Sequence, residues 1–247
     1  MPSATMPDPP SARDPAESGP RMDGTSARVL LVHYTYTQQS RAMSDAMADA
    51  FREQGCEVTQ SAIELVDERY APRFSRFPMD NAFWGVLRML PAQLLRKTGQ
   101  IQIGPEARAG GYDLVCVFSP TWWLTTSLPV RSFLKSPTTC AVLDGARFTD
   151  VVVCRRYWGG NHRTVKKLGV KGGGEYVDGI HFAYAGGQIR SLMSLISYLG
   201  SGTYRARYFG VPIPRTNLTD AQLAEGRVFA GTLANWLAEP ASNVRPT

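Results

Sequence analysis

The chain of 247 residues is poor in the side chains that most often hold metals or form disulfides. It has three histidines and four cysteines, Cys56, Cys116, Cys140 and Cys154, with no CxxC pair and no histidine at the spacing of a zinc site. Cys116 and Cys154 fall inside apolar runs typical of strands, which favours buried free thiols and a reducing compartment. The sequence therefore predicts no metal site and a cytoplasmic protein.

Long apolar runs and targeting signals are also absent from the sequence. No stretch of about 18 apolar residues could span a bilayer, and this absence predicts a soluble protein. Residues 1–25 are rich in Pro, Ser, Ala and charge, and they lack the apolar core of about 7–15 residues that a secretory signal needs. We expect 1–25 to be a disordered leader, with Met6 or Met22 as other possible starts, and 241–247 to be a tail.

Basic residues outnumber acidic ones, but they do not cluster. The formal net charge is +6 and the pI is about 9.3, with Lys and Arg spread along the chain. This pattern indicates anionic ligands and predicts no nucleic-acid partner. No GxGxxG motif is present for a separate dinucleotide domain, so any NAD(P)H would have to bind transiently.

The apolar pattern alternates between strands and helices. The runs typical of strands are 28–34, 56–63, 112–118, 150–154 and 176–184. Helical patterns lie between them at 43–51, 128–134, 161–168 and 219–237. The sequence therefore predicts one α/β domain over 26–240, a doubly wound five-stranded parallel sheet with helices on both faces. In such sheets the ligand lies outside the carboxyl ends of the strands, so the loops after strands one, three and four become candidate sites.

Two apolar segments exceed this minimal plan. Residues 68–104 form an inserted helical segment before the third strand, and residues 187–200 are similarly apolar. We expect the two segments to cover the core and each other. A substrate lid, a homodimer face and a peripheral membrane contact are the alternatives.

The loop after the first strand carries three hydroxyls at a strand-to-helix junction. A phosphate needs several donors that converge from one side, and a helix N-terminus adds backbone N–H groups. The expected phosphate loop consists of Thr35, Tyr36, Thr37, Gln38, Gln39 and Ser40. A hydroxyl-rich helix cap that binds nothing is the alternative.

The loop after the third strand contains two adjacent tryptophans. Their flat faces can stack on a planar ligand while backbone groups bind its polar edge. The expected ligand contacts are Ser119, Pro120, Thr121, Trp122 and Trp123. We expect one tryptophan to face the ligand, with a preference for Trp122, and the other to anchor the loop to the core.

The loop after the fourth strand combines cations with two glycines. Arg155, Gly159 and Gly160 are expected ligand contacts, because glycine permits close backbone approach and a cation stabilises an anionic ligand. Tyr157 and His162 are candidate catalytic residues that bind a substrate or supply a proton. For His162 the alternative is a surface histidine at the start of the next helix.

These loops resemble those of the flavodoxin family. Thr35, Thr37 and Ser40 match the hydroxyls of its phosphate loop, Ser/Thr-x-Thr-Gly-x-Thr, and 119–123 is similar to the Ser-Pro-x-Trp-Trp/Tyr loop of flavodoxin-like oxidoreductases. The resemblance covers roughly 28–200 and implies bound FMN and strand order 2-1-3-4-5. Gln38 replaces the family's glycine, so either the loop accepts a left-handed residue at a cost of about 1–2 kcal/mol or its path differs.

The resemblance implies an FMN-dependent oxidoreductase that passes electrons or hydride from NAD(P)H to a quinone-like or other small-molecule acceptor. Two alternatives stay open: a non-enzymatic flavodoxin-type electron carrier, and a flavodoxin-like protein that has lost FMN and serves binding or condensation. The last alternative fits a further similarity to flavodoxin-like proteins labelled dialkylresorcinol condensing enzyme. Since carriers of the family are compact and acidic, the basic charge and extra apolar segments favour the enzyme.

Overall fold

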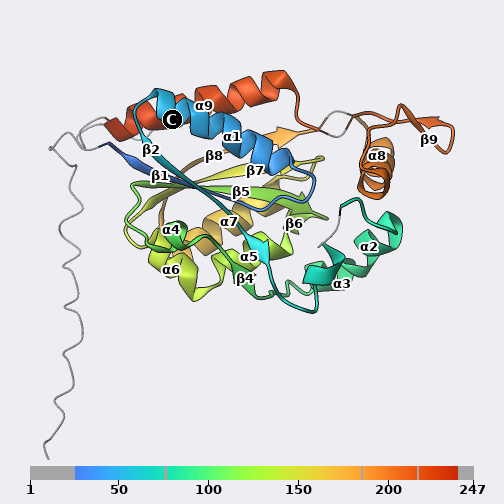
Figure 1. The fold of residues 1–247 in the computed structure, drawn as a ribbon, viewed down its shortest axis with the longest axis horizontal. Helices are drawn as coiled ribbons and strands as arrows, with labels where there is room; N and C mark the ends of the chain where they lie inside the picture. The colour runs from blue at the N-terminus through green and yellow to red at the C-terminus, as the bar shows by residue number, and fades with distance from the viewer. Residues whose placement is uncertain (1–25, 75–76, 185, 216, 239–247) are drawn as a thin grey trace, which may run out of the picture.

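The fold is built on a parallel sheet with strand order β2-β1-β5-β7-β8 (Figure 1). The computed structural model describes residues 26–74, 77–184, 186–215 and 217–238, so the predicted leader and tail lie outside the described residues. The strands are β1 (Arg28–His33), β2 (Glu57–Ala62), β5 (Leu114–Trp122), β7 (Arg147–Cys154) and β8 (Glu175–Ala183). In chain order these five strands are arranged 2-1-3-4-5, so the predicted doubly wound, flavodoxin-like α/β fold is confirmed.

Helices cover both faces of the sheet because the central strands are apolar on both sides. On β1, Val29 and Leu31 pack toward one helical layer, and Leu30 and Val32 pack toward the other. The first layer is formed by α1 (Gln39–Glu53) and α9 (Asp220–Ala238). The second is formed by α4 (Pro105–Arg108), α5 (Leu128–Leu134), α6 (Pro137–Leu143) and α7 (Gly159–Lys171). Figure 1 shows these two layers above and below the sheet.

The insertion before β5 is closed at its base by a short antiparallel pair, β3 (Glu64–Leu65) and β4 (Ile101–Gln102). Within it lie a 3-10 turn η1 (Ala71–Arg73) and two short helices, α2 (Ala82–Arg88) and α3 (Leu90–Leu94). The helix α8 (Gln188–Ser201) contacts α2, and it is followed by the hairpin of β9 (Arg207–Tyr208) and β10 (Val211–Pro212). The expectation that the two extra apolar segments cover each other is confirmed, and both lie at the right-hand end of the molecule in Figure 1.

A buried arginine connects the C-terminal end of α3 to the sheet. Arg131 on α5 is 1% exposed and donates to Gln93 Oε1 at 2.7 Å, to the Lys97 carbonyl at 3.1 Å and to the Thr126 carbonyl at 3.1 Å. Gln93 in turn donates to the Trp122 carbonyl at 3.2 Å. Burial lowers the pKa of Arg131 to about 10, so the guanidinium stays charged at neutral pH, where several oxygens compensate its desolvation. The insertion is therefore bonded to the strand end that carries the tryptophans.

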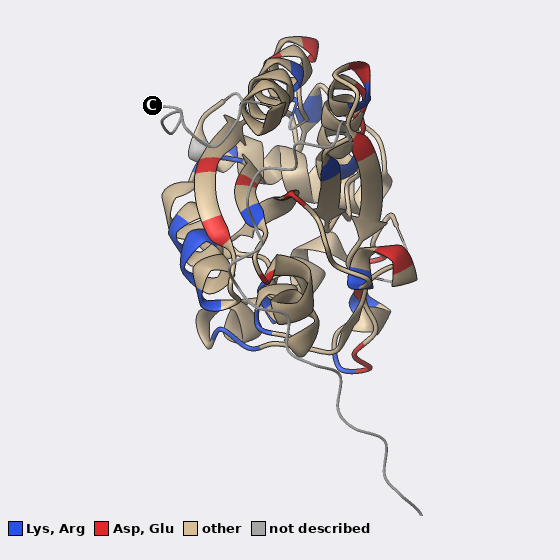
Figure 2. Cartoon of the chain, turned by 90° about the vertical axis from the view of Figure 1, so that its left-hand side faces the viewer, with Lys and Arg blue, Asp and Glu red and all other residues tan. Residues whose placement is uncertain are grey.

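Charged side chains are distributed over many elements. Figure 2 looks onto the left-hand side of Figure 1, and it shows Lys and Arg among Asp and Glu on strands and helices alike.

Across the ranges that the structure describes, no helix has the length and apolar character needed to cross a membrane.

Candidate functional site

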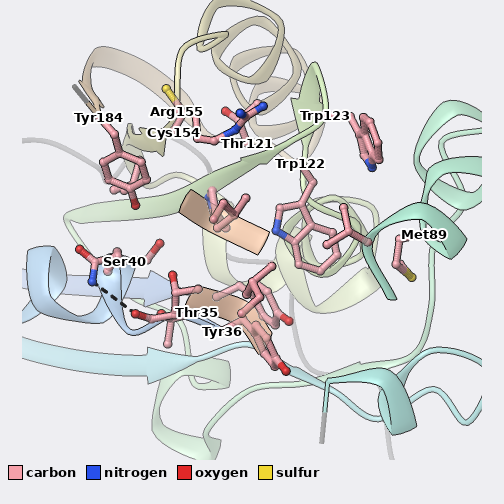
Figure 3. A pocket seen from close by; sticks show the side chains of 18 of the residues that line it. Thr35, Tyr36, Ser40, Met89, Thr121, Trp122, Trp123, Cys154, Arg155 and Tyr184 are labelled. Atoms are coloured by element: carbon pink, nitrogen blue, oxygen red, sulfur yellow. Dashed lines mark hydrogen bonds between the residues drawn. The ribbon is translucent and has the colours of Figure 1, made fainter. Parts of the chain in front are cut away.

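A cavity of about 260 Å3 opens at the carboxyl ends of β1, β5 and β7, the point where the strand order reverses (Figure 3). Its volume is a little below the roughly 300–1,000 Å3 typical of sites for drug-sized ligands. The structure brings most of the predicted residues together on its wall. These are Thr35, Tyr36, Thr37, Gln39, Ser40, Pro120, Thr121, Trp122, Trp123, Arg155 and Tyr157.

The first wall is the hydroxyl-bearing loop that leads into α1. The Thr35 Oγ1 atom is buried and has no hydrogen-bond partner among the described residues. Ser40, also on this wall, is 3% exposed and lies in the first turn of α1. A buried hydroxyl without a partner is costly, and a helix N-terminus favours an anion. The loop thus combines a hydroxyl donor, Thr35, that lacks an acceptor among the described residues with the positive electrostatic field of the α1 N-terminus.

The two glutamines of this loop differ in their surroundings. Gln38 has a φ of 64° and adopts the left-handed conformation, although it is not glycine, and it does not line the cavity. Of the two loop paths weighed from the sequence, the chain takes the strained one. Gln39 donates to the Thr37 carbonyl at 3.3 Å and accepts from the Leu218 N–H at 2.7 Å, which ties the loop to the segment before α9.

The two tryptophans lie in different environments on the opposite wall. Trp122, still within β5, is stacked on Phe74 of the insertion with ring centroids 4.9 Å apart, and it meets the edge of Tyr34 at 5.6 Å. Trp123 lies at the turn that follows, with a φ of 59°, and is 38% exposed. Both rings line the cavity, and Figure 3 shows them on the side of Met89. Trp122 therefore has the environment of an anchor, and Trp123 has the freer ring, which is the reverse of our preference from the sequence.

Ser119 does not line the cavity, and its hydroxyl is bonded elsewhere. It is fully buried and donates to Asn161 Oδ1 at 2.7 Å, an oxygen that also accepts from Thr126 Oγ1 at 2.7 Å. The Asn161 amide nitrogen donates to the Ser119 carbonyl and to Thr121 Oγ1, both at 3.0 Å. Asn161, which sequence reasoning missed, thus joins the start of α7 to the hairpin of β5 and β6 (Thr125–Thr126). Its position in the first helical turn after the fourth strand was the available signal.

The two predicted glycines also lie outside the cavity wall. A Cβ atom on Gly160 would be 2.4 Å from the carbonyl oxygen of Leu124, whereas one on Gly159 would meet no atom within 4 Å. Gly160 therefore allows α7 to pack closely against the turn of the β5–β6 hairpin, which carries Trp122 and Trp123. This packing explains Gly160 without a ligand.

The third wall brings a cation and a thiol to the cavity. Arg155 donates from Nη1 to Ser191 Oγ on α8 at 3.2 Å, and its burial lowers the pKa of the guanidinium. Burial raises the pKa of Cys154 to about 11, so this thiol is protonated at neutral pH. It is therefore a poor nucleophile, in line with the lack of a Cys-His pair in the sequence.

His162 belongs to a separate polar cluster outside the cavity lining. Its Nδ1 atom lies 3.0 Å from Oδ2 of Asp150, which is fully buried, and Tyr176 donates to the other oxygen of Asp150 at 2.9 Å. The hydrogen bond with Asp150 raises the pKa of His162. Of the two candidate catalytic residues, Tyr157 lines the cavity and is 46% exposed. His162 is instead bonded to Asp150 on β7 and does not line the cavity.

The roof of the cavity is the part that sequence reasoning did not resolve into residues. It comes from two distant segments, the insertion and α8. The residues are Phe74, Met79, Gly85, Val86 and Met89 from the first, and Leu192, Leu195 and Leu199 from the second. The three leucines recur at the helical spacing of three and four residues, which indicates an apolar face but not its partner. Leu124, Val153, Cys154, Arg156, Tyr34 and Tyr184 complete the wall.

Metal chemistry has no candidate ligands within the described ranges, since no group of three or more His, Cys, Asp or Glu side chains is arranged to hold an ion. The sequence-based expectation of no metal site concerned the whole chain and stays a prediction.

Comparisons with known proteins give a low level of likeness. No family model and no curated protein matches the chain. Solved structures that align with it include a flavoprotein in complex with FMN from Lactobacillus acidophilus, with 12% identity, 63% of this chain and 93% of that chain covered, and a TM-score of 0.46. A flavodoxin from the domain Archaea has 10% identity, covers 86% and 99%, and has a TM-score of 0.49. A WrbA-like flavodoxin from Agrobacterium tumefaciens has 12% identity, covers 86% and 98%, and has a TM-score of 0.47.

Proposed function

We propose that the cavity binds FMN and that the chain is a flavoprotein oxidoreductase. The observation that carries the proposal is the buried hydroxyl of Thr35, which has no hydrogen-bond partner in the described part of the chain and lies beside the N-terminus of α1, where the strand order of the sheet reverses. In doubly wound sheets this point is where nucleotide-type ligands bind. A phosphate there would accept from the hydroxyl and lie in the positive field of a 15-residue helix.

The phosphate group of FMN would be held by this chain's own hydroxyls and N–H groups. Thr35, Thr37 and Ser40 supply hydroxyls from the loop, and the first turn of α1 contains no acidic residue that would repel the anion. The proposed donors are these hydroxyls and the backbone N–H groups at the N-terminus of α1. Gln39 would hold the loop in shape through its bonds to Thr37 and Leu218, and Gln38 would contribute its left-handed backbone conformation.

The flavin ring system of FMN would lie between the β5–β6 hairpin, which carries the two tryptophans, and the loop after β7. Trp123 offers a partly exposed ring to stack on. Arg155 and Arg156 bring positive charge to the same cavity. Such charge stabilises an anionic reduced flavin and raises its reduction potential.

The roof favours an enzyme over an electron carrier. FMN when bound supplies hydride and electron transfer, and the protein has to position the partners and exclude water. The apolar roof from the insertion and α8 covers the cavity with the side chains of Met89, Val86 and Leu195. We propose NAD(P)H as the transient donor and a quinone-like or other small acceptor, with Tyr157 at the cavity wall to bind or protonate it.

The test compares FMN with riboflavin, which has the same ring and no phosphate. The purified protein is incubated with FMN and then freed of excess ligand. It is expected to keep flavin absorption bands at about 370 and 450 nm. Riboflavin is expected to bind at least about tenfold more weakly, because it loses a charged hydrogen-bonded group. Failure of both ligands to bind would overturn the proposal and favour a flavodoxin-like protein without FMN. If FMN binds but the protein does not reduce quinones with NAD(P)H, the result would favour the non-enzymatic electron carrier over the enzyme.

A further inference from the structure

The insertion carries apolar side chains on two opposite sides. The helices α2 and α3 are separated only by Met89, whose φ of −81° and ψ of −15° are right-handed helical, and the Gln93 N–H bonds to the Met89 carbonyl at 3.0 Å. At about 100° per residue, one side holds the buried or half-buried Ala82, Gly85, Val86, Met89, Ala92 and Gln93. This inner side contributes Gly85, Val86 and Met89 to the roof of the cavity.

The opposite side is apolar and exposed to solvent. We define it as the outer face of the insertion, formed by Phe83, Trp84, Leu87, Leu94 and Leu95. Their exposed fractions are 54%, 51%, 37%, 68% and 68%, respectively. Five large apolar side chains within 13 residues of one surface segment are unusual for a protein surface in contact only with water, and such patches mark interaction sites.

Positive charge accompanies the outer face. Arg88, Arg96 and Lys97 are exposed and belong to the same stretch of chain, and from residue 81 through 105 the sequence contains no Asp or Glu. The exposed Asp80 lies beside Trp84 and Arg88, where the exposed Arg73 adds a further cation. Arg96 adopts a left-handed conformation with a φ of 50° directly after α3, and the Lys97 N–H bonds to the Ala92 carbonyl at 2.9 Å. The two cations thus follow Leu94 and Leu95 directly in the chain.

The charge distribution decides which partner fits. A second copy of the chain on this face would bring the same three cations against each other at an apolar interface, and like charges oppose association. An anionic lipid surface offers the complementary charge, and aromatic and leucine side chains flanked by Lys and Arg are the composition of helices that lie in a bilayer interface.

We propose that the outer face of the insertion docks on a bilayer surface that contains anionic lipids. Trp84, Phe83 and the two leucines enter the interfacial region, and Arg88, Arg96 and Lys97 contact the headgroups. The inner side of the same helices roofs the cavity, so docking places the cavity next to the lipid phase and makes lipid-soluble molecules its local substrates. The docking goes beyond the proposed function and needs no bound flavin.

The experiment is sedimentation of the full chain with vesicles. Phosphatidylcholine vesicles that contain phosphatidylglycerol are compared with vesicles of phosphatidylcholine alone. The parent protein is expected to sediment with the anionic vesicles, and Leu94→Ser with Leu95→Ser is expected to reduce partitioning at least about tenfold. Arg96→Gln with Lys97→Gln is expected to reduce it by about fivefold or more on anionic vesicles only.

The matched control is the double variant Val170→Ser with Val228→Ser. These valines are 53% and 71% exposed on α7 and α9, so the change removes comparable exposed apolar surface from other elements. It is expected to leave partitioning unchanged. The proposal is overturned if the parent protein ignores both kinds of vesicle or if the control loses binding as the leucine variant does. It is equally overturned if light scattering shows a dimer that the leucine variant abolishes, because the occupant of the face is then a second copy. FMN titration of the same variants separates these outcomes from a failure of the proposed function.

Discussion

Replacing Thr35 by valine tests the site because it is expected to change stability and ligand affinity in opposite directions. Valine keeps the branched shape of threonine and removes only the hydroxyl. In the ligand-free protein the buried Thr35 Oγ1 has no partner in the described residues, and a buried polar group left unbonded costs about 1–3 kcal/mol. Thr35→Val is therefore expected to leave the free energy of unfolding unchanged or to raise it by up to about 1 kcal/mol, because part of that cost is relieved by local water.

The same substitution is expected to weaken FMN binding. A hydrogen bond to a charged group contributes about 1.5–3 kcal/mol, which corresponds to a loss of about 10- to 150-fold in affinity. Riboflavin binding is expected to stay unchanged, since riboflavin has no phosphate to accept the bond. The combination distinguishes a phosphate-binding hydroxyl from one that serves the fold.

Two assays on one preparation measure these effects. Urea unfolding of flavin-free protein gives the stability, and quenching of flavin fluorescence on titration gives the affinity. Thr232→Val is the matched control, because Thr232 on α9 is exposed and donates to the Val228 carbonyl at 3.1 Å, on an element that contributes no residue to the cavity wall. A Thr35→Val protein that unfolds more easily and still binds FMN as tightly as the parent would refute the reasoning.

Three further predictions concern the loops and the polar cluster. Gln38→Gly is expected to raise the melting temperature, with a gain of about 0.5–1 kcal/mol, because left-handed backbone costs a side-chain-bearing residue about 1–2 kcal/mol and glycine's entropy offsets part of it. Trp123→Ala is expected to weaken FMN binding by up to about tenfold in a fluorescence titration with little change in melting, whereas Trp122→Ala is expected to cost about 3–5 kcal/mol of stability. The raised pKa of His162 means that its bond to Asp150 stabilises the fold fully below the ordinary histidine pKa of about 6.5 and less as pH rises through the higher folded value. The melting-temperature gap between the parent and His162→Gln is therefore expected to narrow from pH 6 to pH 9; a constant gap would contradict this linkage.

The strand order could be predicted because the signals are local. Each central strand is an apolar run that must be buried on both faces, and each is followed by a helical pattern, so few arrangements satisfy burial. The ends of the elements were harder to predict. The third strand was expected to stop at residue 118, but β5 continues to Trp122, because β7 pairs with residues 119–120 and β6 pairs with residues 121–122. Trp122 is therefore a strand residue that packs against Phe74 and Tyr34, and Trp123 lies in the turn that follows the strand.

The roof could not be predicted to the residue, because it depends on contacts between α2 and α8, which are about 100 residues apart in the chain. The sequence showed that 68–104 and 187–200 are apolar and require a partner. It did not show that Phe74 stacks on Trp122 or that Leu195 faces the cavity. Similarly, the exposed outer face and the buried inner face of the insertion have nearly the same apolar character in sequence, and only the fold distinguishes them.

Hydroxyl and amide side chains present the same difficulty at the site itself. From the sequence, Ser119 and Thr35 are equivalent: each follows a buried strand at the edge where the ligand is expected. The structure separates them by their partners, because Ser119 is bonded to Asn161 while the Thr35 hydroxyl is buried without an acceptor. A bonded polar group is explained by the fold, and an unbonded one costs free energy unless a ligand completes it. That difference, more than the match of the loop to a motif, is why we propose that the phosphate binds at the loop before α1.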